Sequence, residues 1–424
     1  MYIQRFPMST SVAGPMTFKQ VLGITVMRRI WYAQIVSLLG DFLALFAVIS
    51  VVSFKLNGTP AEVTGVQIAY MLPLAVLGPL AGVFVDRWPL KPTLVASDLI
   101  RAGLVVLLVL STSLWQIYLT LVALSCVSSF FAPAQSVTIR SHVPHEGLLS
   151  ANALMQIAMM GIRIIGPAAA GALVAAFGAR LCYAVDGVSF VASAALIGSV
   201  AIVRPPSPAT SAQSANSRIR QIWIDMVEGV RFIVHHAALS FVVMAMAAGL
   251  FTIGCFGPLI AIFVRESLHA SAGMFGFISA TIGVGLMAGT QALRALAHRL
   301  SNEAMVLSGL VGIGVGVFLL GALPYVAATF LATFTIGFAF AGIIVPAQTL
   351  MQQETPPALM GRISSTVMSV VFFAQVLGLV VSGVLGQAIG VRAVFFLCAA
   401  LAAALAAAGH FFLAAAKRSA PATT

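Results

Sequence analysis

The chain has 424 residues, of which 60% are hydrophobic and only 8% are charged. A soluble globule needs far more polar surface, so the composition excludes an ordinary soluble protein and predicts a membrane protein. The formal net charge is +11, but Lys and Arg lie scattered at the ends of apolar runs rather than in basic clusters. This scatter is typical of membrane topology and argues against a nucleic-acid partner.

Apolar stretches remain when the chain is cut at charges and at Pro or Gly clusters. Each is about 20 residues or longer, which is the length that crosses a bilayer as a helix. The sequence therefore predicts twelve membrane spans, at residues 31–54, 62–84, 93–112, 115–138, 149–176, 181–203, 237–264, 271–296, 302–322, 325–350, 363–388 and 391–416. No cleavable signal precedes them, so the first span is expected to direct insertion.

The basic residues predict the orientation, because Lys and Arg near span ends resist translocation. With a cytoplasmic N-terminus, most of them fall on the cytoplasmic side. The outside then receives only Lys55, Arg180, Arg265 and Arg392. We expect a multi-pass protein of the cytoplasmic (inner) membrane with both termini in the cytoplasm.

A Pro-, Ser- and Ala-rich segment at residues 204–220 lacks apolar periodicity and predicts a flexible cytoplasmic linker. The amphipathic stretch after it predicts an interfacial helix. The linker divides six spans from six. The expected organisation is an N-terminal cytoplasmic segment, a six-helix bundle, the linker with its helix, a second bundle and a cytoplasmic tail, at residues 1–30, 31–203, 204–236, 237–416 and 417–424.

Two glycine patterns repeat at half the length of the chain. Residues 166–180 are GPAAAGALVAAFGAR and residues 378–392 are GLVVSGVLGQAIGVR, so three glycines and one Arg recur at an offset of 212. The tripeptide PAQ at 133–135 likewise returns at 346–348. Two parallel six-span repeats explain this pattern, and such repeats hold a substrate site between them near the bilayer midplane. The glycines allow helices to approach closely.

Two motifs resemble signatures of the major facilitator superfamily. GVFVDRWPLK at residues 82–91 is similar to the family's loop between spans two and three. GIRIIGPAAAGAL at 161–173 is similar to the signature of the family's antiporters, with Gly166, Pro167 and Gly171 matching. The resemblance implies an all-α membrane protein whose twelve transmembrane helices form two pseudo-symmetric six-helix bundles.

Further stretches resemble the subgroup that contains the enterobactin exporter and macrolide efflux proteins. They are ASDLIRA at 96–102, SANAL at 150–154 and QQETPPALMGRIS at 352–364. The resemblance covers nearly the whole chain, and it implies export driven by an ion gradient.

Asp41 and Arg163 are the charged residues that we expect deep in the membrane. Asp41 lies about ten residues into span one, or roughly 15 Å from its start. A carboxylate there is costly unless it is paired, hydrated or protonated, so we expect Asp41 to carry a coupling proton; a packing role is the alternative. Arg163 lies at a similar depth in span five, which neighbours span one in the superfamily. We hypothesise that the two residues pair in one conformation and separate in the other. Anchoring of an anionic substrate and a purely structural ion pair are the alternatives for Arg163.

The loop after span two resembles a cytoplasmic latch. We place its residues at the cytoplasmic face, where charged groups are readily hydrated, and the resemblance implies that they bridge to adjoining helix ends only in the outward-facing state. They are Gly82, Asp86, Arg87, Lys91, Asp98 and Arg101. A solvated loop that follows the charge bias is the alternative.

The central cavity of this fold is lined by spans one, four, seven and ten. This favours Gln34, Gln135 and Gln348 as lining residues. Met244 and Phe251 in span seven are further candidates, because an apolar surface rich in Met and Phe suits an amphipathic molecule. Ordinary packing or lipid contact is the alternative for these two.

The sequence lacks a phosphate-binding Gly-rich loop, metal-ligand spacing of His or Cys, and a nucleophile triad at one depth. We expect no enzyme, no cofactor and no metal site. The sequence predicts a monomeric secondary exporter of a small amphipathic organic molecule, drug- or siderophore-like, that exchanges protons by alternating access across the lipid bilayer. A lysophospholipid transporter, an importer of a specific metabolite and a channel or sensor are the alternatives.

Overall fold

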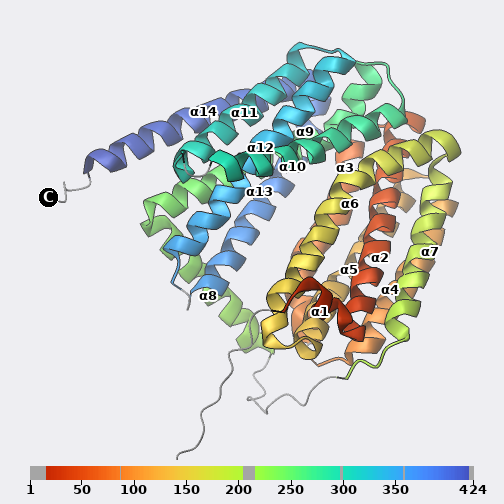
Figure 1. The fold of residues 1–424 in the computed structure, drawn as a ribbon. Coiled ribbons are helices and arrows are strands. Elements are labelled where there is room, and N and C mark those ends of the chain that lie inside the picture. Colours follow the sequence, from red (N-terminus) through yellow and green to blue (C-terminus); the bar gives the residue numbers. More distant parts are fainter. Residues whose placement is uncertain (1–15, 86, 204–214, 297–298, 357–358, 420–424) are drawn as a thin grey trace, which may run out of the picture.

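The structure is a computed structural model that describes residues 16–85, 87–203, 215–296, 299–356 and 359–419. Every regular element within these residues is a helix (Figure 1). Twelve helices are long and apolar enough to cross a membrane, which confirms the predicted number of spans.

The first six of these helices form one bundle. They are α2 (Thr25–Ser50) with its π-helical extension η1 (Val51–Lys55), α3 (Pro60–Val85), α4 (Leu90–Leu110), α5 (Leu114–His142), α6 (Leu148–Phe177) and α7 (Ala179–Gly198). α2 begins several residues earlier than expected, so Arg28 and Arg29 lie in its first turns rather than before it.

The other six form the second bundle. They are α9 (Ala237–Glu266), α10 (Ala272–Leu296), α11 (Asn302–Ala322), α12 (Val326–Glu354), α13 (Met360–Ile389) and α14 (Val391–Ser419). The short α1 (Phe18–Gly23), the turn η2 (His145–Gly147) and α8 (Ala215–His235) lie at one end of the molecule (Figure 1). We call this end the linker end and the opposite end the far end.

α8 starts inside the segment that was expected to be a flexible linker. It packs along α13, where Gly229 lies against Thr366 so closely that an added Cβ would be 2.9 Å from the Thr366 Cβ. Glu228 accepts a 2.6 Å ion-paired hydrogen bond from Arg362. Contact with α13 therefore helps to fix which face of this helix is buried.

The repeated glycines occupy equivalent contacts in the two bundles. Gly171 on α6 lies against α10, since an added Cβ would be 2.7 Å from the Gly276 Cα. Gly383 on α13 lies against α3, where the Cβ would be 3.4 Å from the Ala61 Cα. The fifth helix of each bundle thus crosses the second helix of the other through small residues, which permit close approach in lipid.

A third glycine of the repeat ends a helix in each bundle. Gly178 ends α6 with φ of 79°, and Gly390 ends α13 with φ of 85°. This left-handed conformation favours glycine because it has no Cβ. The repeat in the sequence therefore encodes helix crossings and helix ends at matching positions.

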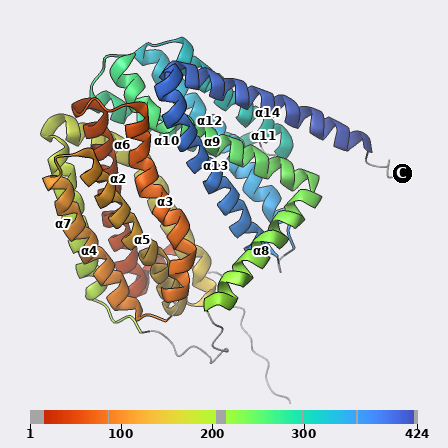
Figure 2. The ribbon, with the colours of Figure 1, turned by 180° about the vertical axis from the view of Figure 1, so that it is seen from behind.

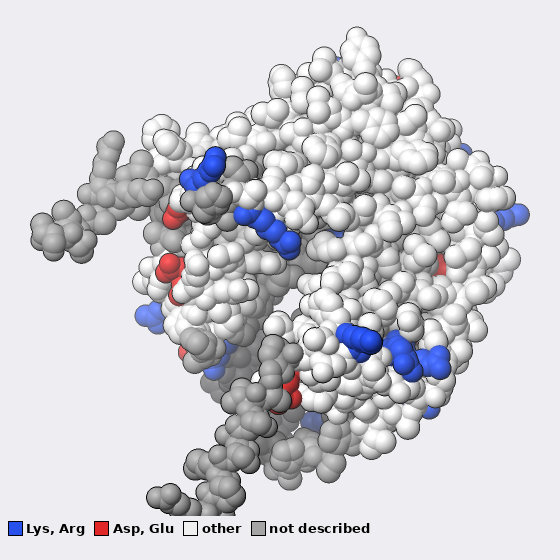
Figure 3. Space-filling model, viewed as in Figure 1, with Lys and Arg blue, Asp and Glu red and all other residues white. Residues whose placement is uncertain are grey.

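The two bundles converge at the far end and separate toward the linker end (Figures 1 and 2). At the closed end, the rings of Phe46 on α2 and Phe275 on α10 stack with centroids 4.5 Å apart. A space-filling view shows a hollow between the two halves (Figure 3). This conformation is closed at the far end and open at the linker end.

Candidate functional site

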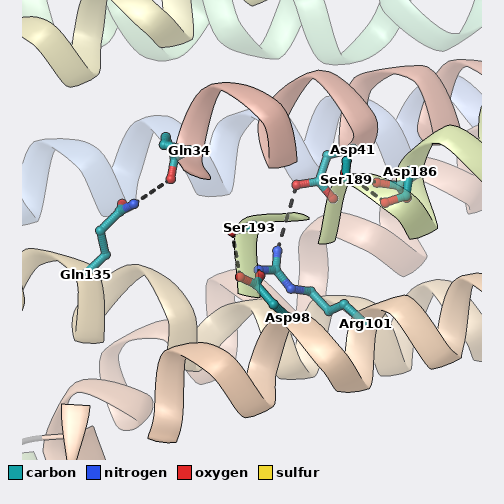
Figure 4. Close-up of polar contacts among 8 residues, drawn as sticks. All are labelled: Gln34, Asp41, Asp98, Arg101, Gln135, Asp186, Ser189 and Ser193. Atoms are coloured by element: carbon teal, nitrogen blue, oxygen red, sulfur yellow. Dashed lines mark hydrogen bonds and ion pairs between the residues drawn. The ribbon is translucent and has the colours of Figure 1, made fainter. Parts of the chain in front are cut away.

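Charged side chains from three helices of the first bundle meet inside the protein (Figure 4). Asp41 comes from α2, Asp98 and Arg101 come from α4, and Asp186 comes from α7. α7 packs against both α2 and α4, which brings the three helices together. All four residues lie within membrane-spanning segments, where charged groups are costly and rare.

Arg101 is shared between two carboxylates. Its Nη2 donates a hydrogen bond to Asp98 Oδ1, one turn earlier on the same helix, and its Nη1 lies 3.9 Å from Asp41 Oδ2. The Ser193 hydroxyl donates to the other oxygen of Asp98 at 2.6 Å. Asp98 is thus held by two partners, whereas Asp41 lies at the outer limit of an ion pair.

Aromatic rings enclose the guanidinium of Arg101. Its Cζ lies 4.6 Å from the ring centroid of Phe131 and 4.2 Å from that of Phe190, which are cation–π distances. The side chains of Arg101 and Asp98 are 4% and 0% exposed, but that of Asp41 is 22% exposed. Asp41 is therefore the member of this ion-pair network that water or a substrate reaches most easily.

Asp186 adds a third carboxylate to the cluster. It is 1% exposed, and the Ser189 hydroxyl donates to its backbone carbonyl at 2.7 Å and lies 3.5 Å from its side chain. Gly40, next to Asp41, packs against it so closely that an added Cβ would be 2.5 Å from Asp186 Oδ1. Among the described residues Asp186 forms no ion pair.

The cluster thus holds three carboxylates and one guanidinium. Sequence reasoning missed Asp186, although a lone acid in the apolar stretch CYAVDGVSF, followed by Ser189 and Ser193 on the same helix, could have indicated it. Buried charges without partners are strongly unfavourable, so this site favours binding of added positive charge. No group of three or more His, Cys, Asp or Glu side chains in the described part of the chain is placed to hold a metal ion.

The expected position of Asp98 and Arg101 at the cytoplasmic face is wrong. They lie about two and three turns into α4, and both are buried. The sequence shows how far each residue is from the helix start, but not that this face of α4 turns toward α2 and α7. Contacts with Asp41 and Ser193, rather than hydration, compensate for their burial.

The other latch residues lie where α3 ends and α4 begins. Arg87 is exposed, Lys91 and Gly82 are partly buried, and Asp86 lies outside the described residues. Neither Arg87 nor Lys91 forms an ion pair with another described residue. The latch role stays a prediction.

Arg163 is not the partner of Asp41 in this conformation, because Arg101 takes that place. Arg163 is exposed on α6, between the side that contacts α2 through Gly166 and the side that contacts α10 through Ile164. The exposed polar residues Gln156 and Asn152 share its side of the helix, at spacings of seven and eleven residues from it, respectively. α6 thus carries a polar stripe in a membrane span.

The structure joins two of the expected cavity residues. Gln135 on α5 donates a 2.6 Å hydrogen bond to Gln34 on α2 (Figure 4), and both are partly buried. Gln348 is exposed on α12. Phe251 is partly buried in the core, and its carbonyl lies against Gly378 on α13.

Met244 does not line the space between the bundles. It lines a cavity of about 320 Å³ formed with residues of α11 and α14, among them Leu310 and Leu405. These two helices lie on the side of the second bundle remote from the first (Figures 1 and 2). The prediction for Met244 is wrong because the sequence identified its helix but not the rotation of that helix about its axis.

Comparison with known proteins identifies the family. The model of the transmembrane secretion effector family matches residues 18–422. This chain belongs to that family of major facilitator transporters. It is 28% identical over 381 residues to the uncharacterized transporter YfiS of Bacillus subtilis, covering 87% of this chain and 88% of YfiS. It is 26% identical over 387 residues to macrolide efflux protein A of Streptococcus pyogenes, covering 88% and 92% of the two chains.

Solved structures of major facilitator transporters share the fold. The nucleoside transporter NupG superposes with a TM-score of 0.70 at 15% identity, covering 92% of this chain and 99% of NupG. A bacterial homologue of the human lysosomal transporter Spinster, in an inward-facing conformation, gives a TM-score of 0.66 at 12% identity, covering 95% and 96%. The resemblance seen in the sequence is confirmed, and transporters of this kind are not enzymes.

Proposed function

We propose that this transporter is a proton-coupled exporter of a small amphipathic organic molecule. The observation that carries the proposal is the charge cluster, in which Arg101 bridges a sealed carboxylate, Asp98, and a more accessible one, Asp41. A proton on Asp41 removes its attraction for Arg101, which then stays with Asp98. Proton binding thereby changes an ion pair that joins α2 to α4.

Relief of the unbalanced charge gives the proton a reason to enter. With three carboxylates facing one guanidinium, each bound proton lowers the cost of burying the cluster. Alternating access exposes Asp41 to each side of the membrane in turn, so a proton that binds on one side leaves on the other. Asp186 lies beside Asp41 and shares this role in the proposal.

The direction and substrate class rest on two supports. Macrolide efflux protein A and the multidrug efflux pump Tap of Mycolicibacterium fortuitum, 23% identical over 80% of this chain, carry export in their names. The polar stripe of α6 with Arg163, the Gln34–Gln135 pair and Gln348 supplies polar groups next to apolar helices, which suits an amphipathic molecule. We further propose a monomer in the cytoplasmic membrane, with the linker end inside the cell.

Accumulation of fluorescent amphiphiles, macrolides, siderophores and lysophospholipids in a pump-deficient bacterium tests the proposal. Cells with the wild-type protein are expected to accumulate less of at least one compound, and a protonophore should abolish the difference. Asp41→Asn should abolish it too, since the amide cannot exchange a proton. Glu303→Gln, which changes a carboxylate in the first turn of α11, far from the cluster, should export normally.

Two results would count against the proposal. Export by Asp41→Asn at the wild-type rate would remove Asp41 from coupling. Transfer of lysophospholipid without sensitivity to the protonophore would instead favour a lipid transporter of the same fold.

A further inference from the structure

One guanidinium crosses from the second bundle to the first at the far end. Arg265, in the last turn of α9, donates from Nη1 to the backbone carbonyls of Ser53 and, at 3.2 Å, Gly58. Its Nη2 pairs with Glu266 at 2.5 Å. The side chain of Arg265 is only 17% exposed, so these charge-assisted bonds form in a partly dehydrated place, where they are stronger than in water.

The π-helical turn η1 contains the Ser53 carbonyl that accepts from Arg265. In this turn Leu56 N–H bonds to the Val51 carbonyl at 2.9 Å, and Gly58 N–H bonds to that of Val52 at 2.8 Å. The next carbonyl, that of Ser53, is thereby left to the guanidinium. Single π-helical turns are often found at functional sites.

The contact joins residues at equivalent positions of the two repeats. Ser53 and Arg265 are 212 positions apart, which is the same offset that relates the repeated glycines. They are therefore equivalent positions, at the ends of the first helix of each bundle. Because only the second bundle carries an Arg there, the contact is one-sided, and a single side chain controls it.

Among the described residues, aromatic rings and glycines also join the bundles at this end. Phe275 stacks on Phe46 and lies 6.3 Å from Phe54, centroid to centroid, and Gly171 lies against Gly276. Such surfaces separate without leaving a charged group unpaired. Separation of the bundles at this end must instead strip Arg265 of both carbonyls.

We infer that Arg265 is the gating residue of the far end, and that its bonds to η1 set how often this transporter opens there. The inference requires only that the protein alternates access, which its family does, and it is independent of the substrate and of the coupling ion. Removing the guanidinium should raise the ratio of far-end-open to far-end-closed molecules at least about tenfold, the factor expected for the loss of even one hydrogen bond to a charged group.

Distances between spin labels on the two bundles test the inference. One pair, Thr112→Cys with Ala327→Cys, reports on the far end, and a second, Leu149→Cys with Ser365→Cys, reports on the linker end. All four positions are exposed, and the partly buried Cys126 is replaced by Ser. In Arg265→Gln the far-end distance should lengthen and the linker-end distance should shorten in a larger fraction of molecules.

Arg392 supplies a matched control at the same end. It donates from Nε to the Gly321 carbonyl at 2.8 Å, but both residues belong to the second bundle. Arg392→Gln should leave both distance distributions as in the wild type. Arg265→Lys keeps the charge but reaches one carbonyl rather than two, so it should give a smaller change, and it replaces Arg265→Gln if that variant does not fold.

Unchanged distributions in Arg265→Gln, or in Arg265→Lys if that variant replaces it, would overturn the inference. An equal change in Arg392→Gln would overturn it too, because the effect would then belong to charge at this end. Since no substrate or proton gradient is used, failure of this test and failure of proton-coupled export are separate results.

Discussion

At the scale of the residue, Arg101 is the ion-pair partner that stabilises the buried carboxylate of Asp98. If it is lost, Asp98 keeps only Ser193 as a partner while it remains 0% exposed. Breaking a buried pair by removing one partner costs about 3–5 kcal/mol. We expect Arg101→Gln to lower the thermal unfolding midpoint of the purified protein strongly. Arg163→Gln, which changes an exposed Arg, should lower it far less.

The double variant separates the ion pair from other effects of Arg101. When Asp98→Asn is combined with Arg101→Gln, no unpaired charge remains at this position. The double variant should therefore be more stable than Arg101→Gln alone, as measured by the same thermal unfolding. If Arg101→Gln unfolds at the wild-type temperature, the cluster does not hold the helices as we describe.

The sequence assigned the site residues to their helices, but it did not show which face of each helix carries them. Counting along apolar spans assigned Asp41, Gln34 and Gln135 to the membrane-spanning helices on which the structure has them. Asp98 was assigned to the wrong environment, because its distance from the helix start says nothing of which neighbour it faces. The face of a helix that carries a residue is set by how the helix packs against its neighbours. This packing could not be predicted from the sequence of the chain alone.

At the scale of the element, the crossing of α6 and α10 depends on the absence of side chains. A Cβ on Gly171 would lie 2.7 Å from the Gly276 Cα, which is closer than real contacts allow. Gly171→Val should push the helices apart and lower transport about tenfold or more, because overpacking costs about 1–3 kcal/mol. Gly161→Val, on the same helix with open space around it, should transport close to the wild-type rate.

Transport rates at matched membrane levels of the two variants decide this prediction. An equal loss in both variants would mean that valine acts by destabilising the α6 helix itself, and not by preventing the close contact between α6 and α10. The repeat of glycines in the sequence was enough to predict that such crossings exist. It did not predict the π-helical turn η1 or the start of α8 inside the expected linker.

At the scale of the whole molecule, the twelve spans and their division into halves followed from hydropathy and the linker. The conformation did not, because both states of such a transporter bury similar apolar surface and differ by small energies. The structure is open at the linker end, with its contacts between halves gathered at the far end. The direction of transport also depends on which end of the molecule faces the cytoplasm.

The charges at the helix ends predict this orientation. All four basic residues expected outside lie at the far end: Lys55 ends η1, Arg180 begins α7, Arg265 lies in the last turn of α9 and Arg392 begins α14. Lys and Arg near span ends resist translocation, so the end with few of them faces outward. The open hollow then faces the cytoplasm, where an exporter collects its substrate.

Labelling of single cysteines in intact cells measures the orientation. Thr112→Cys, in the loop between α4 and α5 at the far end, should react with a membrane-impermeant maleimide added outside. Ser365→Cys, near the start of α13 at the linker end, should react only after the cells are permeabilised, and the Cys126→Ser parent should not react in either case. The reverse pattern would invert the topology, place the hollow outside, and turn the proposed exporter into an importer.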